Sequence, residues 1–319
     1  MRRKLTVDLF ENPFIYLKVR YIYLYTVVIS IGIGFQLLLL DNSINLGIFS
    51  SLQEFEFTDP IYEYVFGFIT YFVFAAIAIR QCKLHQVKIG CVIGKIPSRY
   101  SWKSLFFFSI FVFLFLKSLK TIIYYLTSSY FPEWVQSELI NDVGILKLEE
   151  SFAPALYAFF KYVIYTIFAF SIYYFITYGI VFHRFYSKWG IYKAFVFLLL
   201  MINILYFNIS ISTVFSVLYV LIECLLYLKY RTIILLVIFD LSLLAIDLFV
   251  ETCRHLAGQD LISVAQIESE IGLSIAVFTI TAPYIIYWLK QNWFDRDRLM
   301  PYFANAEKHK LEMQSKSGN

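Results

Sequence analysis

The chain has 319 residues, of which 60% are apolar and 20% aromatic, and its mean hydropathy is +0.68. A soluble domain is about half apolar and about a quarter charged, whereas only 16% of these residues are charged. This composition excludes a soluble globular protein, and the net charge of +4 gives no indication of a nucleic-acid partner. We therefore expect an all-α, polytopic protein that lies in a lipid bilayer.

The apolar runs predict about eight membrane spans, because a bilayer core of about 30 Å needs roughly 20 apolar residues per helix. In chain order the expected spans are 21–40, 61–79, 104–126, 153–175, 194–209, 211–228, 232–250 and 271–289. A segment at 1–20, a single transmembrane domain at 21–289 and a polar tail at 290–319 make up the predicted organisation. The tail begins with aromatic anchors, and we expect its polar end to be disordered.

The positions of lysine and arginine predict the orientation of these spans, because cytoplasmic loops carry more of both than translocated loops do. Segments 1–20, 80–103, 183–193, 229–231 and 290–319 together contain 22 of the 27 lysines and arginines. The loops on the other side contain only Lys147 and Arg254. We therefore expect a multi-pass protein of the cytoplasmic (inner) membrane with both termini in the cytoplasm. The first span has no cleavage site and is expected to remain as an anchor.

The cysteines and histidines do not have the spacing of metal ligands. They are Cys82, Cys91, Cys224 and Cys253, and His85, His183, His255 and His309. No CxxC or Cys/His pattern is present, so the sequence predicts no disulfide framework, no metal site and no cofactor. Cys82 beside the membrane leaves lipidation open as an alternative. We interpret His183, next to Arg184, as a contact to lipid headgroups.

Residues 171–194, SIYYFITYGIVFHRFYSKWGIYKA, carry three small residues at marked intervals. Gly190 follows Gly179 by eleven residues, and Ala194 follows four residues later. In these intervals the chain resembles the CPBP family of intramembrane proteases, which includes CAAX prenyl protease type II and bacteriocin-immunity proteins. Trp102 ahead of an apolar helix, the IGKIP loop before it and KYRT at 229–232 extend the resemblance over about residues 61–250.

The resemblance implies a CPBP-protease-like helical core whose catalytic groups are absent from this chain. The family's EExxxR motif would place glutamates at Tyr173 and Tyr174 and arginine at Tyr178, and its later histidines fall near Tyr206 and Ser242. A phenol, with a pKa of about 10, cannot accept a proton near neutral pH. The resemblance therefore implies a pseudoenzyme, in which clustered tyrosine hydroxyls would line a polar, non-catalytic cavity.

Six ionisable residues fall inside the predicted spans, where each costs about 2.5–3.5 kcal/mol on insertion scales unless it faces protein or water. They are Lys117, Lys120, Lys161, Glu223, Asp240 and Asp247. Three cations and three anions favour an intramembrane polar network between helices, with an ion or proton path and snorkelling as the alternatives. From its depth, Asp240 is expected to pair with Lys117 or Lys161.

The leading functional hypothesis is a non-catalytic membrane scaffold, assembly factor or immunity-type protein. Its partners would be the lipid bilayer and another membrane protein or transmembrane helix. An active protease with displaced catalytic groups is the first alternative, although the diglutamate Glu149–Glu150 is followed four residues later by Pro154 rather than arginine. A small ion- or proton-coupled transporter is the second alternative.

Overall fold

The computed structural model describes residues 12–28, 31, 60–98, 100–141, 152–205, 211–256, 264–295 and 299–317. All regular structure within these ranges is helical, which confirms the predicted all-α class. After a short helix at residues 19–28, the elements are α2 (Pro60–Leu84), α3 (Ile89–Ile93), α4 (Trp102–Ser128), α5 (Pro132–Asn141), α6 (Phe152–Ile176), the π-helix η3 (Thr177–Phe182), α7 (His183–Trp189), α8 (Ile191–Leu205), α9 (Ile211–Tyr230), α10 (Ile233–Leu256), α11 (Val264–Asn292) and α12 (Pro301–Ser317).

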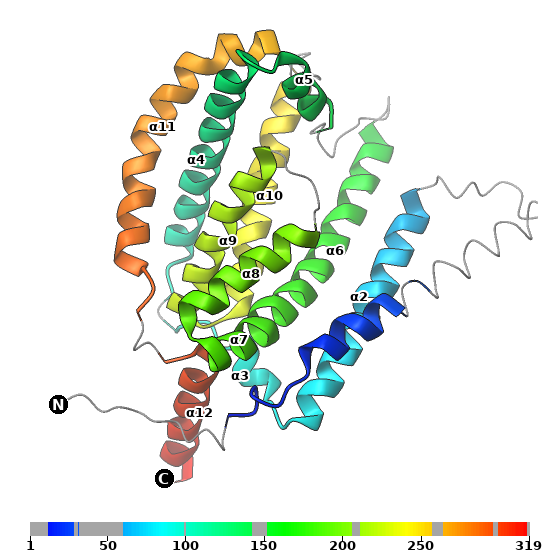
Figure 1. Cartoon of the computed structure of the whole chain (residues 1–319), viewed down its shortest axis with the longest axis vertical. Coiled ribbons are helices and arrows are strands. Elements are labelled where there is room, and N and C mark those ends of the chain that lie inside the picture. Colours follow the sequence, from blue (N-terminus) through cyan, green and yellow to red (C-terminus); the bar gives the residue numbers. More distant parts are fainter. Residues whose placement is uncertain are drawn as a thin grey trace, which may run out of the picture.

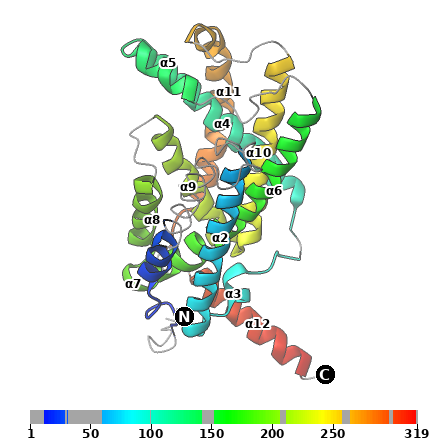
Figure 2. The ribbon, with the colours of Figure 1, turned by 90° about the vertical axis from the view of Figure 1, so that its right-hand side faces the viewer.

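The long helices form a bundle whose axis is vertical in Figure 1. Helix α11 packs along α4, while α10 packs against both α4 and α6. Helix α2 lies at the edge of the bundle, against α6 (Figure 2). The largest buried side chains at the centre include Tyr174, Tyr178, Tyr227 and Phe239, from α6, η3, α9 and α10. Aromatic rings, several of which carry hydroxyl groups, are therefore the largest groups in a core that is otherwise mainly aliphatic.

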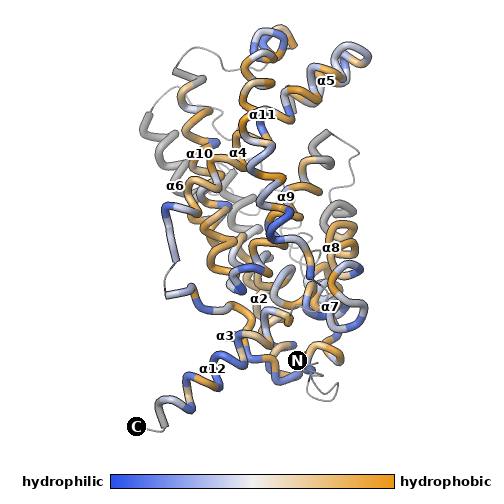
Figure 3. The backbone as a smooth tube through the Cα atoms, turned by 90° about the vertical axis from the view of Figure 1, so that its left-hand side faces the viewer, coloured by the Kyte–Doolittle hydropathy of each residue, from blue (hydrophilic) through white to orange (hydrophobic). Residues whose placement is uncertain are grey.

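Within the described residues, five helices are long and apolar enough to cross a membrane, as expected for an integral membrane protein. They are Gly67–Leu84, Trp102–Ser128, Ile164–Trp189, Ile233–Val250 and Val264–Asn292. Figure 3 shows the apolar colouring of these helices and the hydrophilic colouring of α12. The predicted spans 194–209 and 211–228 correspond to the shorter α8 and to α9, while most of the predicted span 21–40 lies outside the described residues.

The predicted end of the fourth span at residue 175 is wrong. Helix α6 continues without a turn through η3 and α7 to Trp189, where Gly190 ends it with φ +79°. The backbone of Gly190 adopts a conformation that residues with a side chain rarely enter, so a glycine is favoured at this turn. The helical segment can extend so far because Thr177–Phe182 are buried and apolar residues dominate it.

Four segments predicted to lie on the same side of the membrane meet at one end of the bundle, which we call the α3–α12 junction. Asn305 of α12 donates hydrogen bonds to the carbonyl oxygens of Cys91 (2.9 Å) and Arg231 (2.8 Å). The Tyr192 hydroxyl donates to the Phe294 carbonyl at 3.2 Å. At the opposite end, Tyr124 and Ile267 pack together with α5. This arrangement agrees with the alternation of sides expected from the lysine and arginine distribution.

The prediction that the polar tail is disordered is wrong for residues 301–317. These residues form α12, in which Tyr302 and Ala304 are buried while the second half is exposed. Pro301 suits the first position of a helix, because the amide hydrogen that proline lacks would have no partner there. The prediction failed because the tail is hydrophilic on average, although a few residues in the first half of α12 are buried and attach it to the bundle.

Candidate functional site

The centre of the bundle contains a buried carboxylate held by two of the tyrosines at the positions of the EExxxR motif. The Tyr174 hydroxyl donates a hydrogen bond to Oε1 of Glu223, and the Tyr178 hydroxyl donates to Oε2 at 2.7 Å. Glu223 comes from α9, whereas the tyrosines come from α6 and η3. All three side chains are at most 1% exposed. We call these residues, together with Tyr219 and Asp240, the tyrosine–carboxylate cluster.

A second buried carboxylate belongs to this cluster. Asp240 of α10 is 3% exposed, and its Oδ1 accepts a hydrogen bond from the Tyr219 hydroxyl. Tyr219 and Glu223 are four residues apart on α9 and therefore share one face of that helix. One face of α9 therefore carries both Glu223 and the tyrosine that binds Asp240. The phenols act as the hydrogen-bond donors that water would otherwise supply to each carboxylate.

The predicted pairing of Asp240 with Lys117 is wrong, because Lys117 pairs with another acid. Its Nζ lies 2.9 Å from Oδ1 of Asp247, with angles that suit an ion pair better than a hydrogen bond. Lys117 and Lys120 also lie over the rings of Phe113 and Tyr124. Lys117 therefore pairs with Asp247, which lies two helical turns from Asp240 on α10. Asp240 instead accepts a hydrogen bond from the phenol of Tyr219.

The remaining residues predicted for the site differ in where the structure places them. Tyr173 packs edge-on against Tyr174, with ring centroids 5.2 Å apart, and places a fourth phenol beside the three of the cluster. The Ser242 hydroxyl bonds to the carbonyl of Ile238 in its own helix at 2.8 Å, so it contributes nothing to the cluster. Tyr206, Glu149, Glu150 and the side chain of Lys161 lie outside the described residues.

The three small residues of the motif each have a structural role. A Cβ at Gly179 would lie 2.4 Å from Val92 Cγ1 and 3.1 Å from Ile233 Cδ1, so α3 and α10 approach the η3 backbone closely only because this residue is glycine. Gly190 provides the turn with positive φ. Ala194 is fully buried on α8. The three small residues of the motif therefore allow the helices around the tyrosine–carboxylate cluster to pack closely.

The interpretation of His183 as a headgroup contact is wrong, because its side chain is 0% exposed. Its Nδ1 lies 2.9 Å from the Tyr178 carbonyl oxygen, and its Nε2 lies 3.1 Å from the backbone N–H of Tyr302, which donates to it. An Nε2 that accepts must carry no proton, so Nδ1 carries the proton and donates to Tyr178. His183 therefore joins η3 to α12 as a neutral imidazole.

Side chains at the α3–α12 junction are shielded from water. Burial raises the pKa of the Tyr302 phenol, whose hydroxyl accepts a hydrogen bond from the Lys88 amide at 3.2 Å. Burial also raises the pKa of the Cys91 thiol, and Lys88 opposes this effect only in part. A thiol kept protonated is a poor nucleophile and a poor metal ligand. The junction is therefore built for attachment of α12 and offers no reactive cysteine.

Sequence reasoning missed Tyr219 and the role of His183, and only Tyr219 has a local signal that could have indicated it. Tyr219 lies four residues before Glu223, a spacing that could have suggested a phenol on the same face as an intramembrane acid. Nothing local distinguishes His183, because its two partners are backbone atoms, one of them 119 residues away. Among the residues that the structure describes, no group of three or more His, Cys, Asp or Glu side chains could hold a metal ion.

The cluster holds two carboxylates inside an apolar bundle, with tyrosine hydroxyls as their hydrogen-bond donors among the described side chains. Both oxygens of Glu223 are occupied by phenols and the side chain is buried, so the cluster is closed around the acid. No family model, curated protein or solved structure matches the chain.

Proposed function

We propose that this chain is a non-catalytic integral membrane protein that works by binding another membrane protein through a transmembrane helix. Its core would correspond to that of the CPBP intramembrane proteases, and both of its termini would face the cytoplasm of the inner membrane. The observation that supports the proposal is the use of both Glu223 oxygens as acceptors for Tyr174 and Tyr178. A general base must be within reach of water or substrate, and this carboxylate is only 1% exposed and lies behind two phenols.

The same observation argues against an active protease with displaced groups. Glu223 is the acid that lies beside the motif tyrosines, so it is the residue that a displaced mechanism would use. Such a mechanism also needs donors for the oxyanion, usually backbone amides or imidazoles aimed at the reacting carbonyl. His183 cannot serve, because both of its ring nitrogens are engaged by backbone groups of Tyr178 and Tyr302.

The experiment compares wild type with Glu223→Gln, which keeps an acceptor oxygen for one tyrosine but cannot act as a base. A photoreactive residue is placed at exposed Phe72, Val196 or Ile280, and crosslinked proteins are identified in native membranes. We expect a discrete protein adduct from one of these positions, of equal yield in both backgrounds. Quantitative comparison of membrane-protein termini in the same cells tests for cleavage. Cleavage products that disappear with Glu223→Gln would establish a protease and overturn the proposal.

A proton path is the second candidate, and one observation favours it. Polar pairs follow one another through the bundle: Lys117–Asp247, Tyr219–Asp240, and Tyr178–Glu223. Asp247 and Asp240 are about 10 Å apart along α10, and Tyr219 and Glu223 about 6 Å along α9, at 1.5 Å per residue. Intramembrane acids and their partners commonly mark such paths.

Proteoliposomes with an internal pH dye separate this candidate from the first. A proton path predicts dye acidification under an imposed gradient that Glu223→Gln and Asp240→Asn both abolish. Glu312→Gln, which alters an exposed carboxylate of α12, is the matched control and should leave any flux unchanged. A non-catalytic binding protein predicts dye traces identical to those of empty liposomes for all three variants and wild type.

A further inference from the structure

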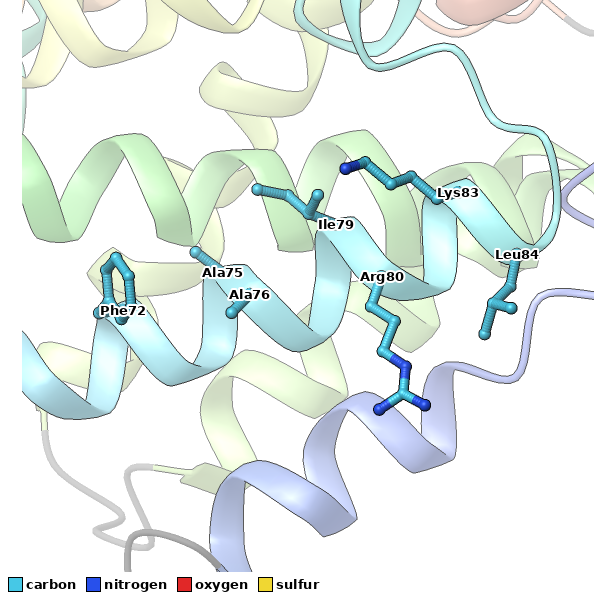
Figure 4. A pocket seen from close by; sticks show the side chains of 7 residues that line it. All are labelled: Phe72, Ala75, Ala76, Ile79, Arg80, Lys83 and Leu84. Atoms are coloured by element: carbon cyan, nitrogen blue, oxygen red, sulfur yellow. The ribbon is translucent and has the colours of Figure 1, made fainter.

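A groove of about 600 Å³ runs along the second half of α2, within the range of about 300–1,000 Å³ typical of ligand sites. Phe72, Ala76, Ile79 and Leu84 form its apolar wall (Figure 4). Phe72 is 66% exposed and Leu84 is 64% exposed, so the wall is open to its surroundings. In a helix that crosses a membrane, those surroundings are lipid.

The groove is about as long as one leaflet of a bilayer is thick. From Phe72 to Leu84 the helix rises by about 18 Å, and half of a bilayer core is about 15 Å. A transmembrane helix of a partner would cross the whole bilayer and would continue past Phe72 along the rest of α2. The dimensions therefore fit an acyl chain that occupies one leaflet better than they fit a helix.

Arg80 and Lys83 lie at the end of the groove nearest the α3–α12 junction; the side chain of Arg80 points toward a neighbouring helix, and that of Lys83 points away from this helix, toward the other side of α2 (Figure 4). That neighbour is the helix of residues 19–28, since Tyr23 packs on Phe74 of α2 with ring centroids 5.4 Å apart. Two more cations lie at the start of this helix, Lys18 just before it and Arg20 in its first turn, and both lie over the Tyr21 ring. None of the described residues that line the groove is acidic. Neither Arg80 nor Lys83 forms an ion pair with any residue in the described ranges.

We propose that this groove binds an anionic glycerophospholipid, with one acyl chain along Phe72, Ala76 and Ile79 and the phosphate group at Arg80 and Lys83. Two unpaired cations above an apolar wall match a ligand that carries its negative charge at one end of a hydrocarbon chain. Arginine suits phosphate because its planar donors can bind two oxygens at once. In the orientation proposed above, the basic end faces the cytoplasmic leaflet, where basic residues are attracted to anionic lipids.

The test is native mass spectrometry of the purified protein titrated with phosphatidylglycerol or phosphatidylcholine of identical acyl chains. Arg80→Gln with Lys83→Gln should reduce phosphatidylglycerol affinity about thirtyfold, since each basic residue near an anionic headgroup contributes about fivefold. Phosphatidylcholine affinity should change by less than about threefold. Ala76→Leu, which fills the wall and keeps both cations, should weaken both lipids equally. Inorganic phosphate at millimolar concentration should not displace the lipid, because it lacks the acyl chain.

Lys103→Gln with Lys193→Gln is the matched control, because both lysines are exposed near the same end of other helices, α4 and α8. This control removes the same charge and should retain lipid selectivity. Equal affinity of wild type for the two lipids would overturn the proposal, as would equal losses in the control and in the Arg80/Lys83 variant. Displacement by inorganic phosphate would also overturn it, in favour of a simple anion site. Thermal unfolding of each variant in detergent verifies that a loss of binding is not a loss of folding.

Discussion

At the scale of single residues, Glu223 and Asp240 place two carboxylates inside the bundle, and neither forms an ion pair with a side chain that the structure describes. An ionised group in an apolar interior is costly unless donors replace its water shell. The phenols of Tyr174, Tyr178 and Tyr219 supply such donors. The stability of the cluster therefore depends on the match between phenol donors and carboxylate acceptors. Removing only the donors or only the acceptor should lower the free energy of unfolding more than removing both.

We predict that Glu223→Leu lowers the free energy of unfolding by about 2–5 kcal/mol, because two buried phenols lose their acceptor at about 1–3 kcal/mol each. Glu223→Gln should cost only about 1 kcal/mol, since the amide oxygen still accepts. Adding Tyr174→Phe and Tyr178→Phe to Glu223→Leu should recover most of the loss. Unfolding titrations in mixed micelles measure each value. A triple variant no more stable than Glu223→Leu would show that the phenols do not depend on the acid.

We predict that Lys117 is coupled to Asp247 and not to Asp240. In a double-mutant cycle, Lys117→Met with Asp247→Leu should give an interaction free energy of about 0.5–3 kcal/mol, as residues in contact do. Lys117→Met with Asp240→Leu should be additive within about 0.5 kcal/mol. The same unfolding titrations provide the data. Coupling of Lys117 to Asp240 at the expense of Asp247 would contradict the observed ion pair.

At the scale of elements, α12 has two halves with different roles. Its first half carries Tyr302, Ala304 and Asn305 onto the α3–α12 junction. Its second half is mostly exposed and touches the rest of the chain through the Lys95–Glu312 ion pair at 2.6 Å. Exposed pairs of this kind contribute little to stability. Only the first half should matter for the integrity of the bundle.

We predict that a chain ending at Ala306 unfolds like wild type, within about 0.5 kcal/mol, because it loses only a mostly exposed segment. A chain ending at Asp295 should lose at least about 3 kcal/mol, since it gives up the buried Met300 and Tyr302 side chains. Thermal unfolding in detergent compares the two chains. Equal stability of both truncations would mean that α12 does not support the bundle.

We predict that acid releases the second half of α12. The hydrogen bond from Lys95 holds the pKa of Glu312 below its ordinary value of 4.5. The pairing therefore contributes above that value and is lost as pH falls through the lowered folded pKa. Spin labels at Ser98→Cys and Ser315→Cys, in a Cys253→Ser background, should show a broader distance distribution at low pH. High salt should act in the same direction at neutral pH, and Glu312→Gln should be broad at every pH.

The elements differ in how far their sequence predicts them. Predominantly apolar runs of 27 and 18 residues predict α4 and α10, since such runs have few other stable forms in lipid. The π-helix η3 cannot be read from residue pattern, because it differs from an α-helix only in hydrogen-bond register. The Glu223–Tyr178 contact depends on the packing of α9 against η3, and the attachment of α12 depends on contacts across more than a hundred residues.

At the scale of the whole molecule, the described helices place the segments rich in lysine and arginine together at the α3–α12 junction. Contacts of Asn305 with Cys91 and Arg231 join three of those segments directly. The four cysteines differ in their exposure to solvent. Cys82, Cys91 and Cys224 are buried, and Cys253 near the end of α10 is exposed. A single accessible thiol lies at the end that the proposed orientation places outside.

We predict that a membrane-impermeant maleimide labels the protein in cells or right-side-out vesicles through Cys253 alone. Cys253→Ser should abolish labelling, and the other three thiols should react only after denaturation because they are buried. Mass spectrometry of the labelled peptide identifies the site. Labelling of Cys253 only after the vesicles are opened would mean that the orientation is the reverse of the one proposed.

The π-helix η3 fixes the rotation of α7 relative to α6 within the continuous helical segment Phe152–Trp189. In η3 the backbone carbonyl of Tyr178 receives the His183 imidazole, while the Tyr178 hydroxyl reaches Glu223. Deletion of one residue from Thr177–Phe182 would rotate everything beyond it by about 100°, the angle between successive residues in an α-helix of 3.6 residues per turn. Either the phenols would then leave Glu223 or His183 would leave α12. Any torque that turns α7 about its axis is therefore transmitted to the buried acids at the centre.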